Sequence, residues 1–216
     1  MITDLLIGLP AQRPGGVALT LIIAIGSAAG ALLLGVVYAA ICVGAPRLSL
    51  TLQAPMALLR GVPLLLLIFA LAQLTSLPLV MAGYVALLLY SLCHVGETLR
   101  GYLASYPPGL RDQSRVLGFG WAREWVTLRL PWTLRSSLDA LATHWISLLK
   151  DSGALAVLGL GELTTVASTL SQNADVRDWE LIIGLAGLFY LSVTIILIQS
   201  LKFLRRRLPP QEAMVI

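Results

Sequence analysis

The residues with the most chemical potential in this chain are ionisable side chains within strongly apolar surroundings. They are Glu97, Arg100, Arg135, Asp139, His144, Lys150 and Asp151. A charge at such a position is costly and usually faces a partner or a water-filled cavity. Two pairs have the spacing of neighbours on one helix face, Glu97 with Arg100 and Arg135 with Asp139. We expect each pair to form a salt bridge that holds a helix end.

A second group of these residues has chemistry suited to a polar solute. His144 lies in the middle of an apolar stretch and is the best candidate for lining a solute pathway, with Glu97 as a further candidate. Lys150 and Asp151 offer an ammonium and a carboxylate, the two groups that a zwitterionic solute requires. The alternatives are a hydrogen-bonded core histidine, and a lysine and aspartate that tie a loop to a helix end.

The sequence lacks the residue patterns that phosphate binding or metal binding would need. The chain has two lysines, Lys150 and Lys202, and neither follows a Gly-x-x-x-x-Gly pattern, so a phosphate-binding loop is not expected. Cys42 and Cys93 lie in apolar stretches without metal-ligand spacing and are expected to be small core residues. We therefore expect no enzyme activity in this chain, no cofactor and no metal site.

The elements that carry these residues must reside in lipid. Of the 216 residues, 57% are hydrophobic and only 12% charged, and the mean hydropathy is +0.86. Soluble domains carry about 25% charged residues. This argues against a cytosolic enzyme, a nucleic-acid-binding domain and a disulfide-stapled secreted domain. We expect one membrane domain over residues 1–216, without a cleavable signal peptide because Asp4 precedes any basic residue and the following apolar stretch is too long.

Long uncharged stretches set the expected membrane helices. At about 1.5 Å per residue, a stretch of some 20 residues crosses the ~30 Å hydrocarbon layer. Residues 61–96 carry no charge but are too long for one crossing, and the polar run that ends at Pro78 divides them. The expected spans cover residues 17–43, 51–74, 79–99, 132–149 and 181–201.

The fourth span follows from charge rather than from hydropathy. Residues 100–129 carry five arginines, and Lys202 with three arginines follows the last span. Lys and Arg collect in cytoplasmic loops, so both segments should lie inside, and two crossings must separate them. We therefore predict an all-α membrane protein with five transmembrane helices, the N-terminus outside and the C-terminus cytoplasmic. Twelve of the 15 Lys and Arg then lie inside, and residues 150–179 form an outer loop.

The cytoplasmic loop over residues 105–130 mixes polar and apolar residues at roughly helical spacing. Pro107 and Pro108 should end the preceding helix, and Gly118 and Gly120 predict two short helices with a sharp turn near Gly118. On spacing alone, the simpler interpretation is an amphipathic helix on the lipid headgroups, with its tryptophans in the interface and its arginines on anionic lipid. The alternative is a helix docked in a groove of a cytoplasmic partner.

The same loop resembles the EAA loop of ABC-transporter permeases of the polar amino-acid uptake group. It carries Asp112-Gln113-Ser114 in place of Glu-Ala-Ala, then Gly118 after three residues, and Leu128-Arg129-Leu130-Pro131 after nine more. Four further segments resemble motifs of that family, in the same order. They are Arg60-Gly61-Val62-Pro63-Leu64-Leu65, Glu97-Thr98-Leu99-Arg100-Gly101, Leu148-Leu149-Lys150-Asp151-Ser152 and Gly161-Glu162-Leu163. The resemblance covers roughly residues 16–201.

This resemblance implies a type I ABC importer permease fold and a permease subunit that translocates a polar amino acid across a bacterial cytoplasmic (inner) membrane. The implied partners are cytoplasmic ATPase subunits, a second permease chain of the same or a homologous kind, a periplasmic or lipid-anchored binding protein and membrane lipid, with no nucleic acid. The ATPase would hold a short coupling helix. Its contacts carry over to Gly109, Asp112, Gln113, Ser114, Arg115, Leu117, Gly118 and Phe119.

The altered triplet retains one acidic residue, which we expect at a helix N-terminus, where it suits the helix dipole. Two other classes of protein remain on the residues alone. A secondary transporter driven by an ion gradient usually has an internal repeat, which this sequence lacks. A structural or assembly membrane protein does not need a basic, glycine-interrupted loop and a charged fourth span.

Overall fold

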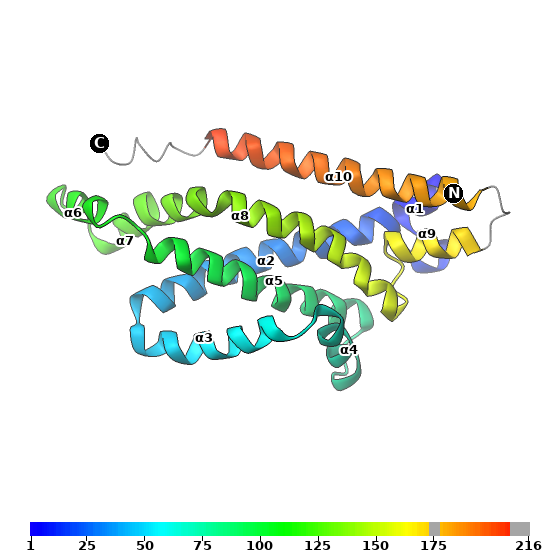
Figure 1. The fold of residues 1–216 in the computed structure, drawn as a ribbon, viewed down its shortest axis with the longest axis horizontal. Helices are drawn as coiled ribbons and strands as arrows, with labels where there is room; N and C mark the ends of the chain where they lie inside the picture. Colours follow the sequence, from blue (N-terminus) through cyan, green and yellow to red (C-terminus); the bar gives the residue numbers. More distant parts are fainter. Residues whose placement is uncertain (173–177, 208–216) are drawn as a thin grey trace.

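The computed structural model describes residues 1–172 and 178–207, and these residues are almost entirely helical (Figure 1). In chain order the elements are α1 (Ile2–Ile7), η1 (Pro10–Gln12), α2 (Gly16–Gly44), α3 (Pro46–Gly61), α4 (Leu64–Leu74), α5 (Leu79–Ala104), α6 (Pro108–Val116), α7 (Trp121–Glu124), η2 (Trp125–Arg129), α8 (Leu130–Asp151), η3 (Ser152–Leu158), α9 (Leu163–Gln172) and α10 (Trp179–Arg207). No strand occurs in these two ranges, so the predicted all-α class is confirmed.

The centre of the molecule is the pair formed by α2 and α5, because glycines let the two backbones approach closely. A Cβ atom added to Gly35 would lie 3.3 Å from the backbone of Gly96, and one added to Gly96 would lie 3.0 Å from the Tyr38 ring. Small residues commonly replace large ones where membrane helices touch, since lipid tails are as apolar as any side chain. These contacts bring α2 and α5 close together.

Helices α8 and α10 lie along the same axis as the α2–α5 pair (Figure 1). Helix α8 packs on α5 and α2, and Leu141 and Leu148 of α8 are both buried in the core. Helix α10 packs against α8 and α9 and has few buried residues, namely Ile182, Ala186 and Leu201. Its apolar surface is therefore largely open to lipid or to another membrane helix.

Three described helices, α2, α5 and α10, are long and apolar enough to cross a membrane. Helices α3 and α4 together would supply a fourth crossing if they count as one bent span. Helix α8 is long enough, but its polar and ionisable residues make it less apolar than these three helices. The five-span arrangement therefore stays a prediction.

The helix expected as one piece over residues 51–74 is two helices. Helices α3 and α4 meet at a bend of 102° around Val62 and Pro63. Proline has no N–H for the helical ladder and restricts the preceding residue to extended conformations, so the helix cannot continue through this point. Val62 accordingly has an extended backbone.

The two ends of the bundle carry different elements. The α6–α7 segment and the last turn of α10 lie at one end, while α1 and α9 lie at the other (Figure 1). The expected outer loop forms η3 and α9, although its residues 173–177 lie outside the described part of the chain. The basic segments that were predicted to share one side of a membrane are thus at the same end.

Candidate functional site

Helix α6 sits at one end of the bundle and is anchored by one of its faces. Pro108 occupies its first turn, where a missing N–H is no loss. Leu110 and Ser114, four residues apart, are buried against the rest of the chain, and Ser114 Oγ donates a hydrogen bond to the Arg111 carbonyl at 2.8 Å. Ser114 therefore belongs to the inner face of α6 rather than to its outer surface.

Gly118 ends α6 in a Schellman motif. Its φ of +73° lies in the left-handed region that other residues rarely adopt. The Gly118 N–H donates to the Arg115 carbonyl at 3.0 Å, and the Phe119 N–H donates to the Ser114 carbonyl at 2.9 Å. The predicted sharp turn near Gly118 is thus present, with α6 before it and α7 after it.

The outer face of α6 and its turn is a mixture of charged and bare apolar side chains. Asp112 and Arg115 are exposed, and so are Val116 and Leu117, whose exposed fractions are 88% and 70%. The expected position of Asp112 at the N-terminus is wrong, because α6 begins at Pro108 and its first turn has no acidic residue. Such a mixed surface is typical of a docking surface for another protein.

A buried ion pair braces the segment that leads from α7 into α8. Glu124 accepts a hydrogen bond from Arg129 Nε at 2.8 Å, and both side chains are mostly buried. The Arg129 guanidinium also lies over the rings of Tyr106 and Trp125, at 5.5 and 5.8 Å from their centroids. The five-residue separation of Glu124 and Arg129 in the sequence does not predict this pair.

The predicted Glu97–Arg100 salt bridge is present, at 2.8 Å. Glu97 also accepts a hydrogen bond from the Tyr38 hydroxyl, which connects α5 to α2. For Asp139, however, the salt-bridge partner is Arg205 of α10 at 3.1 Å rather than Arg135. Arg135 Nη1 donates to the Arg205 carbonyl, so both residues connect α8 to α10.

His144 lies in a polar cluster between α5 and α8. Its Nε2 is 2.9 Å from Ser91 Oγ, and its ring stacks on that of His94 with centroids 5.2 Å apart. His94 Nδ1 is 2.9 Å from the Tyr90 carbonyl and so donates to it. His144 is thus hydrogen-bonded and partly exposed, compatible with both roles considered for it.

The other predicted pathway residues do not form one group, because Lys150 and Asp151 are neighbours at the end of α8 and Glu97 lies on α5. Asp151, half-buried at the end of α8, interacts electrostatically with its neighbour Lys150 and also with His94 of α5. Lys150 is exposed, and Glu97 bonds to α2 rather than to α8. The structure therefore brings Asp151 toward the histidine cluster and leaves Lys150 and Glu97 outside it.

Glu162 organises the loop at the opposite end. It is fully buried, and its carboxylate accepts hydrogen bonds from the Thr164 and Thr165 N–H groups at 2.9 and 2.7 Å, at the start of α9. Burial raises the pKa of Glu162, and these hydrogen bonds oppose that rise. A β-bridge between Gly16 and Glu162 joins this loop to the start of α2.

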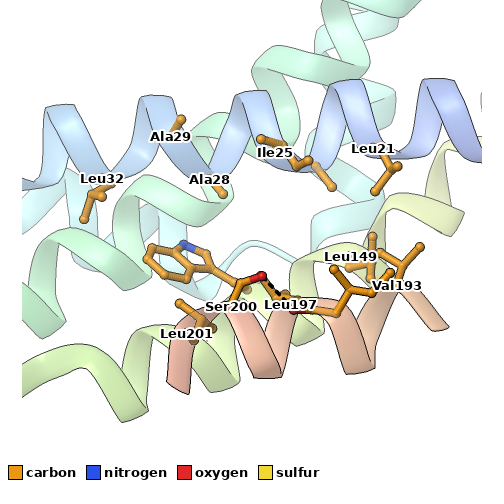
Figure 2. A pocket seen from close by; sticks show the side chains of 13 residues that line it. Leu21, Ile25, Ala28, Ala29, Leu32, Leu149, Val193, Leu197, Ser200 and Leu201 are labelled. Carbon is orange, nitrogen blue, oxygen red and sulfur yellow. Dashed lines mark hydrogen bonds between the residues drawn. The ribbon is translucent and has the colours of Figure 1, made fainter. Parts of the chain in front are cut away.

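Two cavities accompany these features. One, of about 460 Å³, lies between α2, α8 and α10; Figure 2 shows that its walls are apolar side chains, with Ser200 as a polar exception. The predicted pathway residues do not line it. The other, of about 660 Å³, lies between the end of α2 and the α6–α7 segment, and two arginines line it.

Comparison with known proteins gives consistent results. A family model described as "Binding-protein-dependent transport system inner membrane component" matches residues 31–210. The arginine ABC transporter permease protein ArtQ of Haemophilus influenzae is 30% identical over 115 residues, which cover 53% of this chain and 51% of that protein. The glutamine transport system permease protein GlnP of Escherichia coli is 32% identical over 130 residues, covering 59% and 57%. The chain spans about half the length of these two relatives.

A longer match is to the probable glutamine ABC transporter permease protein GlnP of Bacillus subtilis, 30% identical over 169 residues and 76% of each protein. Among solved structures, a chain of an amino acid ABC transporter with histidines superposes with a TM-score of 0.75 at 24% identity, covering 89% of this chain and 92% of that one. A chain of the inward-facing MetNI methionine ABC transporter gives 0.73 at 17% identity, covering 89% and 94%. These superpositions show a shared fold.

Proposed function

Because this chain belongs to the family of binding-protein-dependent transport system inner membrane components, we propose that it is the permease subunit of an ABC importer for a polar amino acid. The observation that carries the proposal is the α6 segment. It is a short helix, closed by Gly118, that presents charged and apolar side chains outward while its other face is anchored in the bundle. The relatives named above are permeases for arginine and glutamine.

In the proposed topology, α2, the bent α3–α4 pair, α5, α8 and α10 cross the cytoplasmic membrane, with the N-terminus outside. The arginines of the 105–130 loop and those at the end of α10 then lie on the cytoplasmic side, as the positive-inside rule requires. Their common position at one end of the bundle supports this assignment (Figure 1). Asp139 and Arg135 support α8 as a crossing, since both contact α10 rather than facing lipid alone.

The α6 segment is the proposed contact with a separate cytoplasmic ATPase. The outward residues Asp112, Gln113, Arg115 and Leu117 would touch the ATPase, whereas Ser114 would hold α6 to the permease. Helices α7, η2 and α8 follow one another without leaving the helical region of φ and ψ. A displacement of α6 by a nucleotide-driven ATPase would pass through the turn at Gly118 into this continuous helical segment and so reach α8, which carries His144.

The amino acid would pass close to His144 and Asp151. Both side chains retain some exposure, and His94 extends the polar surface between them. A carboxylate near the outer end suits the ammonium of an amino acid, and imidazole N–H groups suit its carboxylate. An external binding protein would deliver the solute, and a second permease chain would complete the pathway.

The test compares two glycines two residues apart in complexes of the full chain with its ATPase. Gly118→Asp forces a non-glycine residue into a left-handed backbone, whereas Gly120 has an ordinary φ of −68° and precedes α7, where aspartate is a favourable N-cap. We expect Gly118→Asp to insert normally but to lose coupled ATP hydrolysis and uptake, and Gly120→Asp to retain both.

Normal uptake by an inserted Gly118→Asp variant would contradict the proposal. So would uptake by proteoliposomes of this chain alone under a proton or sodium gradient, since that result would identify a secondary transporter. If no ATPase copurifies with the chain from its native membrane and the chain supports no uptake, these results would indicate a structural role.

A further inference from the structure

The cavity of about 660 Å³ beside the α6 segment contains features that ATPase docking does not explain. Its walls come from the last turn of α2, including Ile41 and Gly44, and from the segment that follows Gly118. It therefore lies where a membrane helix ends, between that end of α2 and the segment that runs from α6 to η2. In the proposed topology this is the level of the lipid headgroups on the cytoplasmic side.

The cavity is lined by two arginines that differ in their surroundings. Buried Glu124 partly neutralises the charge of Arg129. Only Arg129 Nε donates a hydrogen bond to that carboxylate, so the two Nη groups remain for another acceptor. Arg111 is exposed on α6 and lines the same space. Two arginines against one carboxylate leave a net positive charge in a cavity bounded by apolar groups.

Two tryptophans complete the wall. Trp121 and Trp125 have ring centroids 6.0 Å apart, and the exposed fraction of Trp121 is 73%. A large aromatic side chain so exposed is unusual in water but common in the interface layer of a membrane, where its polar N–H and apolar ring both find partners. Below the cavity, Leu33 and Val37 give α2 a strongly exposed apolar surface along which an acyl chain could lie.

We infer that this cavity binds the phosphate headgroup of an anionic phospholipid from the cytoplasmic leaflet, with Arg111 and Arg129 as its phosphate ligands. Basic pockets between membrane helices on this side suit such headgroups. The inference rests on the proposed topology and adds a second partner for the α6 segment. The outward face of α6 serves the ATPase, while the face toward α2 is held to the bilayer by lipid.

The test measures lipid contact at Trp121 with the full chain in nanodiscs. The signal is the fluorescence of the wild type minus that of Trp121→Phe, titrated with a brominated anionic phospholipid or with brominated phosphatidylcholine. We expect saturable quenching by the anionic lipid alone. Arg111→Gln should raise the half-saturating mole fraction about fivefold, the factor that corresponds to ~1 kcal/mol per basic residue near an anionic surface.

The matched control is Arg115→Gln, which removes one charge from the same helix at an exposed position that does not line the cavity. It should leave the half-saturating mole fraction unchanged. Equal quenching by both lipids, or equal effects of the two arginine variants, would overturn the inference. Reversal by inorganic phosphate at constant ionic strength would assign the cavity to a soluble anion, and displacement of lipid by added ATPase would assign it to that subunit. None of these results depends on uptake, so each is distinguishable from failure of the proposed function.

Discussion

Among single residues, Glu162 is the one whose burial most directly makes the stability of the chain depend on pH. Its pKa is raised by burial, so the folded chain binds a proton at this site more readily than the unfolded chain does. The resulting stability is fully present below the ordinary pKa of glutamate and is lost as the pH rises through the raised value. We predict that the apparent unfolding temperature in detergent falls over that interval and that Glu162→Gln removes this component. An unchanged pH profile in Glu162→Gln would show that another group titrates.

A second residue-level prediction concerns the contact between α2 and α5. Tyr38→Phe removes a hydrogen bond to the Glu97 carboxylate and should destabilise the chain by roughly 1 kcal/mol, since interhelical hydrogen bonds in membranes average about 0.6 kcal/mol and charged acceptors strengthen them. Tyr84→Phe is the control, because the Tyr84 hydroxyl makes only a long bond of 3.4 Å to the Gly26 carbonyl between the same helices. Thermal unfolding of both variants in one detergent tests this, and equal shifts would contradict it.

At the scale of elements, the segment η2 brings together a residue pair that the sequence does not predict. Residues three or four apart share a face of an α-helix, so Glu97 and Arg100 were recognisable as partners. Glu124 and Arg129 are five apart, and they meet because η2 is a π-helical turn, which brings residues i and i+5 together. A π-turn has no reliable sequence pattern. The burial of Glu124, which would have pointed to a buried partner, is visible only in the structure.

This ion pair gives a prediction at the same scale. Removing one partner of a buried pair leaves an uncompensated charge and costs about 3–5 kcal/mol, whereas replacing both costs much less. We expect Glu124→Gln and Arg129→Gln to lower the unfolding temperature strongly and the double variant to recover much of that loss. Strictly additive effects in this double-mutant cycle would show that the pair is not an energetic unit.

Other elements differ in how well the sequence predicted them. The helix expected over residues 17–43 is α2, Gly16–Gly44, because a long uncharged stretch has little alternative in an apolar chain. The bend between α3 and α4 was missed although Pro63 stands in the sequence, since hydropathy averages over such a break. The partner of Asp139 could not be predicted from the sequence either, because Arg205 is 66 residues away and only the packing of α8 against α10 brings the two side chains together.

For the whole molecule, the number of crossings is the central prediction. In a background with Cys42→Ser and Cys93→Ser, the single substitutions Arg115→Cys and Thr164→Cys should give cysteines that react with membrane-impermeant maleimide from opposite sides. The Arg115 position should be reached only from the cytoplasm and the Thr164 position only from outside. Labelling of both positions from one side would remove α8 as a crossing and change the proposed role of the α6 segment.

The bend at Val62 and Pro63 leaves backbone groups without helical hydrogen-bond partners. A 102° bend separates the last turn of α3 from the first turn of α4, and proline contributes no N–H to bridge the gap. Carbonyl groups around such a break need hydrogen-bond donors other than helical N–H groups, and hydrocarbon offers none. We therefore expect water to reach the backbone at this bend, so that the corner between the two helices is hydrated within the thickness of the bilayer.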